Sequence, residues 1–302
     1  MWWLPERAFS LDRLWGLLLC LLTTYVVMET NAQQHIIRIR TRMMSCVWLV
    51  LTACLPFMHP LGKPLVAAAL LSVSYMLLFR CYQRHHPQTI VFHAFLMLGI
   101  GSFFAPVMLL MAVPYFLYIA IFLRSLTRKA FWAGVLGLVV PFWCYCVWCL
   151  VTDGMQSLID HIPSAIYHLP STIALLSPEF WEEHFSPLIG EGSEARLFSA
   201  SLIFLFSIVS IVHYLRTNYD DKIRVRMILY IYMSQTIMMM IFLLLQPEHY
   251  ETALALLVAS ASPLIAHYLS LGSSILSNIF FVLSLLLTAG MAAINLFLPL
   301  TF

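Results

Sequence analysis

Two long apolar runs flank a short charged segment in the C-terminal part of the chain: LFSASLIFLFSIVSIVHYL at 197–215, RTNYDDKIRVR at 216–226 and MILYIYMSQTIMMMIFLLLQ at 227–246. An α-helix needs about 20 predominantly apolar residues to cross a bilayer. Each run has that length, so the stretch predicts two transmembrane helices joined by a basic loop. The fold class that it indicates is an all-α bundle of transmembrane helices.

The composition of the whole chain supports the same class. The 302 residues are 62% hydrophobic and only 10% charged, with a mean hydropathy of +0.89. Soluble domains are roughly half apolar and a quarter charged. A chain of this composition cannot cover itself with a charged surface, which excludes a soluble enzyme, a disordered protein and a nucleic-acid binder.

The same criterion predicts about ten spans in a single integral membrane domain covering 1–302. Several spans are short, and two pairs form helical hairpins, one turning at Pro56–Pro64 and the other at Gly99, Gly101 and Pro106. We divide the domain into a six-span half at 1–151, a polar loop at 152–196 and a four-span half at 197–302. The predicted spans are 13–30, 43–58, 64–80, 89–103, 105–123, 130–151, 197–215, 227–246, 253–270 and 274–298.

The charges alternate between the two sets of loops. One set carries 12 of the 16 Lys and Arg residues, and the other carries 11 of the 14 acids. Basic loops face the cytoplasm, so we expect both termini and loop 152–196 on the outer, periplasmic side of a bacterial inner membrane. Alternatively, the first apolar run is a signal peptide with a cleavage site at Thr30-Asn31-Ala32. That alternative would place Arg38, Arg40 and Arg42 after a translocated end, against the charge rule.

Loop 152–196 contains apolar residues spaced by three or four, from Ile159 to Leu176, and a helix-start pattern at Ser177-Pro178-Glu179. This pattern predicts one or two interfacial helices on the outer surface of the bilayer. Asp160 and Glu182 are candidates for a catalytic acid or base, and a solvated acidic face is the alternative. We predict neither a metal nor a cofactor.

Three basic side chains on the outer side are candidates for binding a lipid phosphate: His59, Lys63 and Arg196. Lys63 has the alternative of extending to the membrane surface without a ligand. Ionisable residues within the spans are scarce, and His213 and His267 lie near cytoplasmic ends. This scarcity argues against a proton- or sodium-coupled transporter.

The first six predicted spans, about 13–151, follow a recognisable order. Leu55-Pro56-Phe57-Met58-His59-Pro60 turns directly into a short span, Gly99-Ile-Gly101-Ser-Phe-Phe-Ala-Pro106 breaks the next hairpin, and Gly137-Leu-Val-Val-Pro141-Phe-Trp143 leads outward. This order resembles the membrane module of C-type glycosyltransferases, which take sugars from polyprenyl-phosphate donors. Residues 95–143 also resemble an uncharacterised family of Bacteroidetes integral membrane proteins.

The resemblance implies a transferase-like fold and a groove for polyprenyl phosphate. The transferase family carries its catalytic carboxylate in an outer loop before this region, where the present chain has only Glu6 and Asp12. Three hypotheses follow: a non-catalytic accessory or scaffold subunit of cell-envelope assembly, a lipid-linked saccharide transferase, and a transporter of a lipid substrate. The partners expected are membrane lipid and another membrane protein, with no nucleic acid.

Overall fold

The computed structural model describes residues 11–39, 41–152, 194–272 and 275–297. Within these ranges the regular elements are all helices, so the predicted all-α class is confirmed. The chain forms two compact units, one made of 1–69 with 178–302 and the other of 70–177. We describe each unit by itself.

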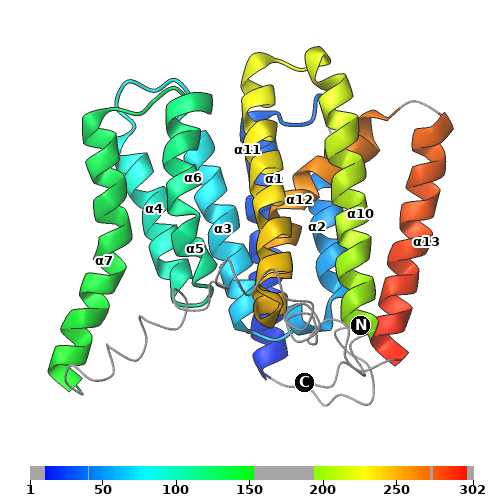
Figure 1. Cartoon of the computed structure of the whole chain (residues 1–302), viewed down its shortest axis with the longest axis horizontal. Coiled ribbons are helices and arrows are strands. Elements are labelled where there is room, and N and C mark those ends of the chain that lie inside the picture. Colours follow the sequence, from blue (N-terminus) through cyan, green and yellow to red (C-terminus); the bar gives the residue numbers. More distant parts are fainter. Residues whose placement is uncertain (1–10, 40, 153–193, 273–274, 298–302) are drawn as a thin grey trace, which may run out of the picture. The chain divides into compact units, whose positions relative to one another are not determined.

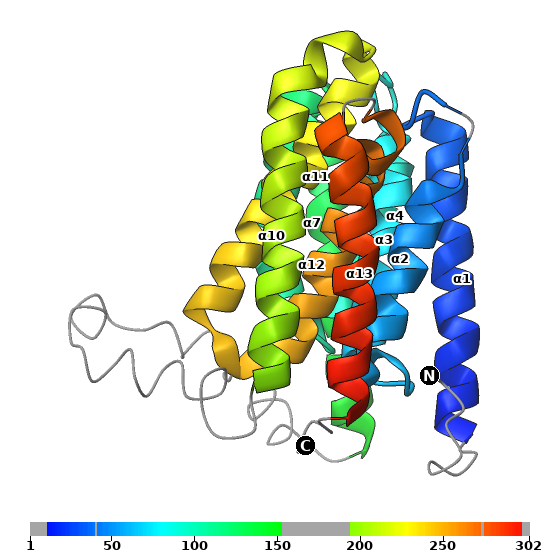
Figure 2. The same cartoon turned by 90° about the vertical axis from the view of Figure 1, so that its right-hand side faces the viewer.

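Unit 1 is organised around helix α12. In Figures 1 and 2 this helix runs among α2, α10 and α11, and all three pack against it. Helix α13 packs on α2 and α10, and α1 packs on α2. The elements of unit 1 are α1 (Leu11–Gln34), α2 (Met43–Cys54), η1 (Pro56–Met58), the start of α3 (Lys63–Phe79), α10 (Glu194–Thr217), η4 (Asn218–Asp220), α11 (Ile223–Leu245), η5 (Pro247–His249), α12 (Tyr250–Leu271) and α13 (Ile275–Phe297).

The sequence of α12 explains its central position. Of its 22 residues, 17 are buried, and many of them are alanine or serine. Small side chains let neighbouring helices approach closely, which favours association inside a membrane. Helix α12 therefore fills the centre of unit 1 along nearly its whole length.

Unit 2 is a smaller group of helices held by a close pair. Its elements are the rest of α3, α4 (Gln88–Ser102), α5 (Val107–Leu110), α6 (Ala112–Leu117), the π-helical turn η2 (Tyr118–Phe122) and α7 (Arg128–Thr152). A Cβ atom at Gly99 of α4 would lie only 3.0 Å from the carbonyl oxygen of Leu138 in α7. On the facing side a Cβ atom at Gly137 of α7 would lie only 2.4 Å from the carbonyl oxygen of Phe92 in α4, so glycine allows the close approach of this pair.

The predicted break in the stretch 89–123 is confirmed. Helix α4 ends at Ser102, and α5 begins at Val107, directly after Pro106. Proline is well suited to such a helix start because its missing N–H would be unpaired there in any case.

Six helical segments are long and apolar enough to cross a membrane, which supports a multi-pass membrane protein. The four other predicted spans correspond to shorter apolar helices of 10–17 residues. At about 1.5 Å per residue, these are shorter than a bilayer core of about 30 Å. The count of about ten spans is therefore not confirmed.

Helices α1 and α2 belong to the same compact unit as α10–α13, and the division into a six-span half at 1–151 and a four-span half at 197–302 stays a prediction. The interfacial helices predicted in 152–196, with Asp160 and Glu182, lie outside the described residues apart from the ends of that loop.

Candidate functional site

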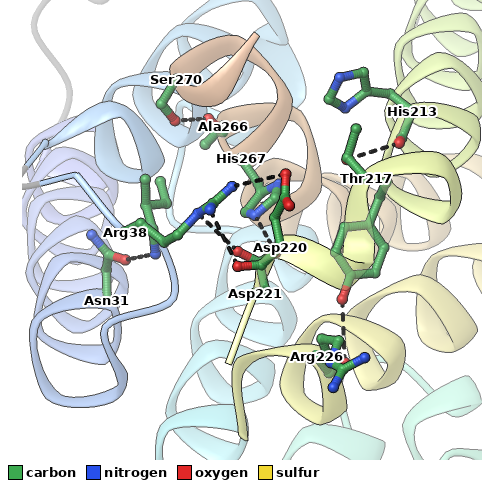
Figure 3. Close-up of polar contacts among 12 residues, drawn as sticks. Asn31, Arg38, His213, Thr217, Asp220, Asp221, Arg226, Ala266, His267 and Ser270 are labelled. Atoms are coloured by element: carbon green, nitrogen blue, oxygen red, sulfur yellow. Dashed lines mark hydrogen bonds and ion pairs between the residues drawn. The ribbon is translucent and has the colours of Figure 1, made fainter. Parts of the chain in front are cut away.

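Charged side chains meet at the end of unit 1 where α1 stops, α10 turns into α11 and α12 finishes. Arg38, Asp220, Asp221 and His267 form what we call the Asp221 cluster (Figure 3). These residues come from the α1–α2 loop, the α10–α11 turn and the last turns of α12. The cluster therefore joins three segments that are far apart in the sequence.

The local sequence places Asp221 at a sharp change of backbone direction. The single turn η4 ends at Asp220, and Asp221 is extended, with ψ of 152°, before Lys222 caps the start of α11. The amide of Asp221 donates a hydrogen bond to the carbonyl oxygen of Asn218, at 3.3 Å. Asp221 is buried in the turn, and its side chain is 0% exposed.

Arg38 supplies the first compensating charge. Its Nε atom lies 3.1 Å from Asp221 Oδ1, in the geometry of an ion pair rather than of an aligned hydrogen bond. Its Nη1 atom donates to the carbonyl oxygen of Asp220 at 3.2 Å, and Nη2 lies 3.9 Å from the Asp220 carboxylate. The guanidinium of Arg38 thus holds the α10–α11 turn through the side chains of Asp220 and Asp221 and through the backbone of Asp220.

His267 contacts the other carboxylate oxygen. Its Nε2 atom lies 3.1 Å from Asp221 Oδ2, and the imidazole is buried. An ionised carboxylate can only accept hydrogen bonds, so Nε2 donates in this contact. The ring of Tyr214 meets the imidazole edge to face, with 5.4 Å between centroids.

A second set of contacts surrounds the Asp221 cluster. Arg224 of α11 donates to the side-chain oxygen of Gln34 at the end of α1. Tyr214 donates its hydroxyl to the carbonyl oxygen of Arg226, at 3.4 Å. The neighbouring rings of His213 and Tyr268 have their centroids 4.3 Å apart. Together these contacts fix α10, α11 and α12 to the end of α1.

Chemically, the cluster is a buried carboxylate balanced by a guanidinium and an imidazole. An isolated buried charge is very costly, so a buried carboxylate is found with charged or hydrogen-bonding partners. Each of the two carboxylate oxygens of Asp221 faces one partner. This arrangement suits a structural clasp between the α1–α2 loop, the α10–α11 turn and the end of α12.

The lipid-phosphate candidates lie at the opposite, acidic end of unit 1. His59 is buried, and its Nε2 atom is 3.0 Å from the carbonyl oxygen of Ala53 in the preceding helix. Lys63, four residues later, is exposed at the first position of α3. Arg196 lies in the first turn of α10, where its carbonyl oxygen accepts a hydrogen bond from the hydroxyl of Tyr250, at 3.0 Å.

His59 and Lys63 therefore occupy different environments, with His59 directed at its own hairpin. The catalytic candidates Asp160 and Glu182 lie outside the described residues. Across the described part of the chain, no group of three or more His, Cys, Asp or Glu side chains is placed to hold a metal ion.

Sequence analysis missed Asp221, although a signal was present. Asp220 and Asp221 form an acidic pair inside a loop that otherwise carries Arg216, Lys222, Arg224 and Arg226. Two adjacent carboxylates in an otherwise basic loop lower its positive charge, which indicates that they have specific partners. His267 and Arg38 were noted separately, but their meeting depends on tertiary packing.

Comparison of the chain with protein-family models, with curated proteins and with solved structures finds no match.

Proposed function

We propose that the protein is a non-catalytic scaffold or accessory subunit of cell-envelope assembly in a bacterial inner membrane. The observation that carries this proposal is the filled interior of unit 1. Helix α12 occupies its centre, and 17 of the helix's 22 residues are buried. A passage through the centre of unit 1 would have to run where α12 lies.

Several polar side chains inside unit 1 bond to the backbone of their own helix or to a neighbouring helix. Ser207 and Ser210 donate to carbonyl oxygens one turn earlier in α10. Asn295 of α13 donates to the carbonyl oxygen of Cys54 at 2.8 Å and lies 3.1 Å from the hydroxyl oxygen of Ser199. These bonds engage Ser207, Ser210, Ser199 and Asn295 with helix backbone or with a neighbouring helix, as expected of polar residues that support helix packing.

A scaffold also needs a surface for its partner. The exposed side of α13 carries large apolar residues, including Ile279, Val282 and Leu286. Gly290 lies on the same helix, and a Cβ atom there would meet nothing within 4 Å. This helix can therefore accept lipid or a second transmembrane helix along its outer side.

Complementation separates a scaffold from an enzyme. The full chain carrying Asp160→Asn with Glu182→Gln is returned to cells that lack the protein, and detergent sensitivity and membrane protein level are measured together. A scaffold should rescue the cells as well as the unchanged chain does at equal protein level. Loss of rescue at an unchanged level would overturn the proposal.

The alternative is a transferase that uses a polyprenyl-phosphate-linked sugar, and one observation favours it. The α2–η1–α3 hairpin turns through Pro56 and His59 into short helices, as the resemblance to C-type glycosyltransferases implies. Lys63→Gln and Arg196→Gln should then abolish sugar transfer in membranes supplied with such a donor. In a scaffold both variants would remain neutral.

A transporter of a lipid substrate is the third hypothesis. It would require unit 1 to open around α12. The close packing of α12 against α2, α10 and α11 gives it the least support of the three.

A further inference from the structure

A pocket of about 710 Å³ opens beside the Asp221 cluster, and its described lining comes entirely from the segment 28–42. This segment is the last turns of α1 and the loop into α2. The pocket lies at the basic end of unit 1, opposite to His59, Lys63 and Arg196. It is therefore a separate site from the lipid-phosphate groove expected from the sequence.

The polar side of the pocket is basic. His35, Arg38 and Arg42 contribute to its lining, and none of its described lining residues is acidic. Arg38 is held by Asp221, as described above. Arg42 and His35 are exposed, and the described residues offer their side chains no ion pair or hydrogen bond.

The loop that forms the pocket is held in place by Asn31. The Asn31 side chain accepts a hydrogen bond from the amide of Ile37 at 3.1 Å and donates one to the carbonyl oxygen of Thr41 at 3.4 Å. His35 has a φ of 51°, and its amide donates to the carbonyl oxygen of Asn31 at 2.8 Å. This left-handed residue ends α1 and turns the chain back over the pocket.

Another part of the pocket lining is apolar. Met28, Ile37 and Ile39 contribute to it, and Ile39 is 55% exposed. A guanidinium beside apolar surface at the end of a membrane helix suits an amphiphile with an anionic head. A soluble anion would make use of only the basic part of this lining.

We propose that this pocket binds the phosphate group of an anionic membrane lipid, with Arg42 and His35 facing the phosphate. Asn31 and Arg38 act as positioning residues. Asn31 holds the loop through Ile37 and Thr41, and Arg38 ties the loop to Asp221. The glycerol and first acyl carbons lie against Ile37 and Ile39. The proposal does not rest on the scaffold function, because it is argued from the described lining of this pocket alone.

The test uses the full chain in nanodiscs of phosphatidylcholine with or without phosphatidylglycerol, and native mass spectrometry counts retained lipid. Phosphatidylglycerol should be retained in preference to phosphatidylcholine. Arg42→Gln should weaken this retention about fivefold, the effect of one cationic side chain near a membrane surface. Combining it with His35→Gln should weaken retention further.

Arg216→Gln is the matched control, because Arg216 is an exposed arginine at the same end of unit 1 and outside the pocket lining. It should leave retention unchanged. Equal losses with Arg42→Gln and Arg216→Gln would show a diffuse surface effect and overturn the proposal.

Inorganic phosphate and glycerol phosphate separate the two sources of a phosphate group. Each is added to the protein in nanodiscs that contain phosphatidylglycerol, and the loss of retained phosphatidylglycerol is measured. Weak competition at millimolar concentration supports the lipid. Binding of inorganic phosphate as tight as that of the lipid would overturn the lipid assignment. Melting temperatures in pure phosphatidylcholine show that each variant is folded.

Discussion

Asp221 and His267 are separated by 46 positions in the sequence, yet Asp221 Oδ2 lies 3.1 Å from His267 Nε2. The other oxygen of the same carboxylate lies 3.1 Å from Arg38 Nε. In lipid the hydrophobic effect does little to hold helices together, so packing and polar contacts must specify which helices meet. The Asp221 cluster provides such a contact between the first hairpin of unit 1 and its C-terminal helices.

Asp221→Asn should lower the free energy of unfolding by about 1 to 3 kcal/mol, because it removes the charged acceptor that His267 contacts in the interior, while Arg38, whose side chain is 44% exposed, stays in contact with solvent. Asp220→Asn is the matched control. The Asp220 side chain is 47% exposed, and its carboxylate is 3.9 Å from Arg38, so its loss should cost less than about 1 kcal/mol. Unfolding by a denaturing detergent measures both. Equal effects of the two variants would show that Asp221 is not the centre of the cluster.

The sequence was sufficient to predict the helices. The apolar runs at 197–215 and 227–246 correspond to α10 and α11. The length of an apolar run and the charged residues at its two ends indicate directly where a membrane helix begins and ends. The break at Gly101–Pro106 was also predictable, since proline acts on its own local backbone.

The site depended on information that no single segment carries. Arg38, Asp221 and His267 lie in three separate segments, and only the packing of α12 against α2, α10 and α11 brings these segments together. His59 was proposed as a lipid-phosphate candidate from its residue type and its place in the outer hairpin link, and this stays a prediction. In the structure its ring is buried against the Ala53 carbonyl, a contact that follows from the tight turn at Pro56–Met58.

Asn295→Leu should loosen the contact of α13 with α2 and α10. The substitution removes the hydrogen bond to the Cys54 carbonyl oxygen and the contact with Ser199, and interhelical bonds of this kind contribute about 0.6 to 2 kcal/mol in membranes. Ser210→Ala removes only a bond within α10 and serves as the control. Disulfide trapping between Cys54 and a cysteine introduced at Thr288, whose carbonyl oxygen lies 3.6 Å from the Cys54 sulfur, reports the contact. A trapping rate unaffected by Asn295→Leu would contradict this role.

Gly16→Ala should be strongly destabilising, because a Cβ atom there would overlap the backbone oxygen of His59. Overpacking in a closely packed region costs about 1 to 3 kcal/mol. The atoms that the new Cβ would meet belong to the backbone of the α2–α3 link, which cannot move aside as a flexible side chain could. Gly290→Ala makes the same change in α13, where nothing lies within 4 Å of the new atom. It should be neutral or stabilising by up to about 1 kcal/mol. Melting temperatures in one detergent compare the two, and a smaller loss for Gly16→Ala than for Gly290→Ala would refute the close approach.

Cysteine labelling tests which loops lie on which side of the membrane. Single cysteines are placed at Tyr219 and Glu248 in a chain whose seven native cysteines are replaced; both positions are exposed, and they lie at opposite ends of α11. Since basic loops face the cytoplasm, Glu248→Cys should react with an impermeant maleimide in intact cells, and Tyr219→Cys only after permeabilisation. Ser193→Cys, in the predicted outer loop, should behave like Glu248→Cys. Reaction of Tyr219→Cys alone in intact cells would invert the orientation, and equal reaction of both would show that α11 does not cross the membrane.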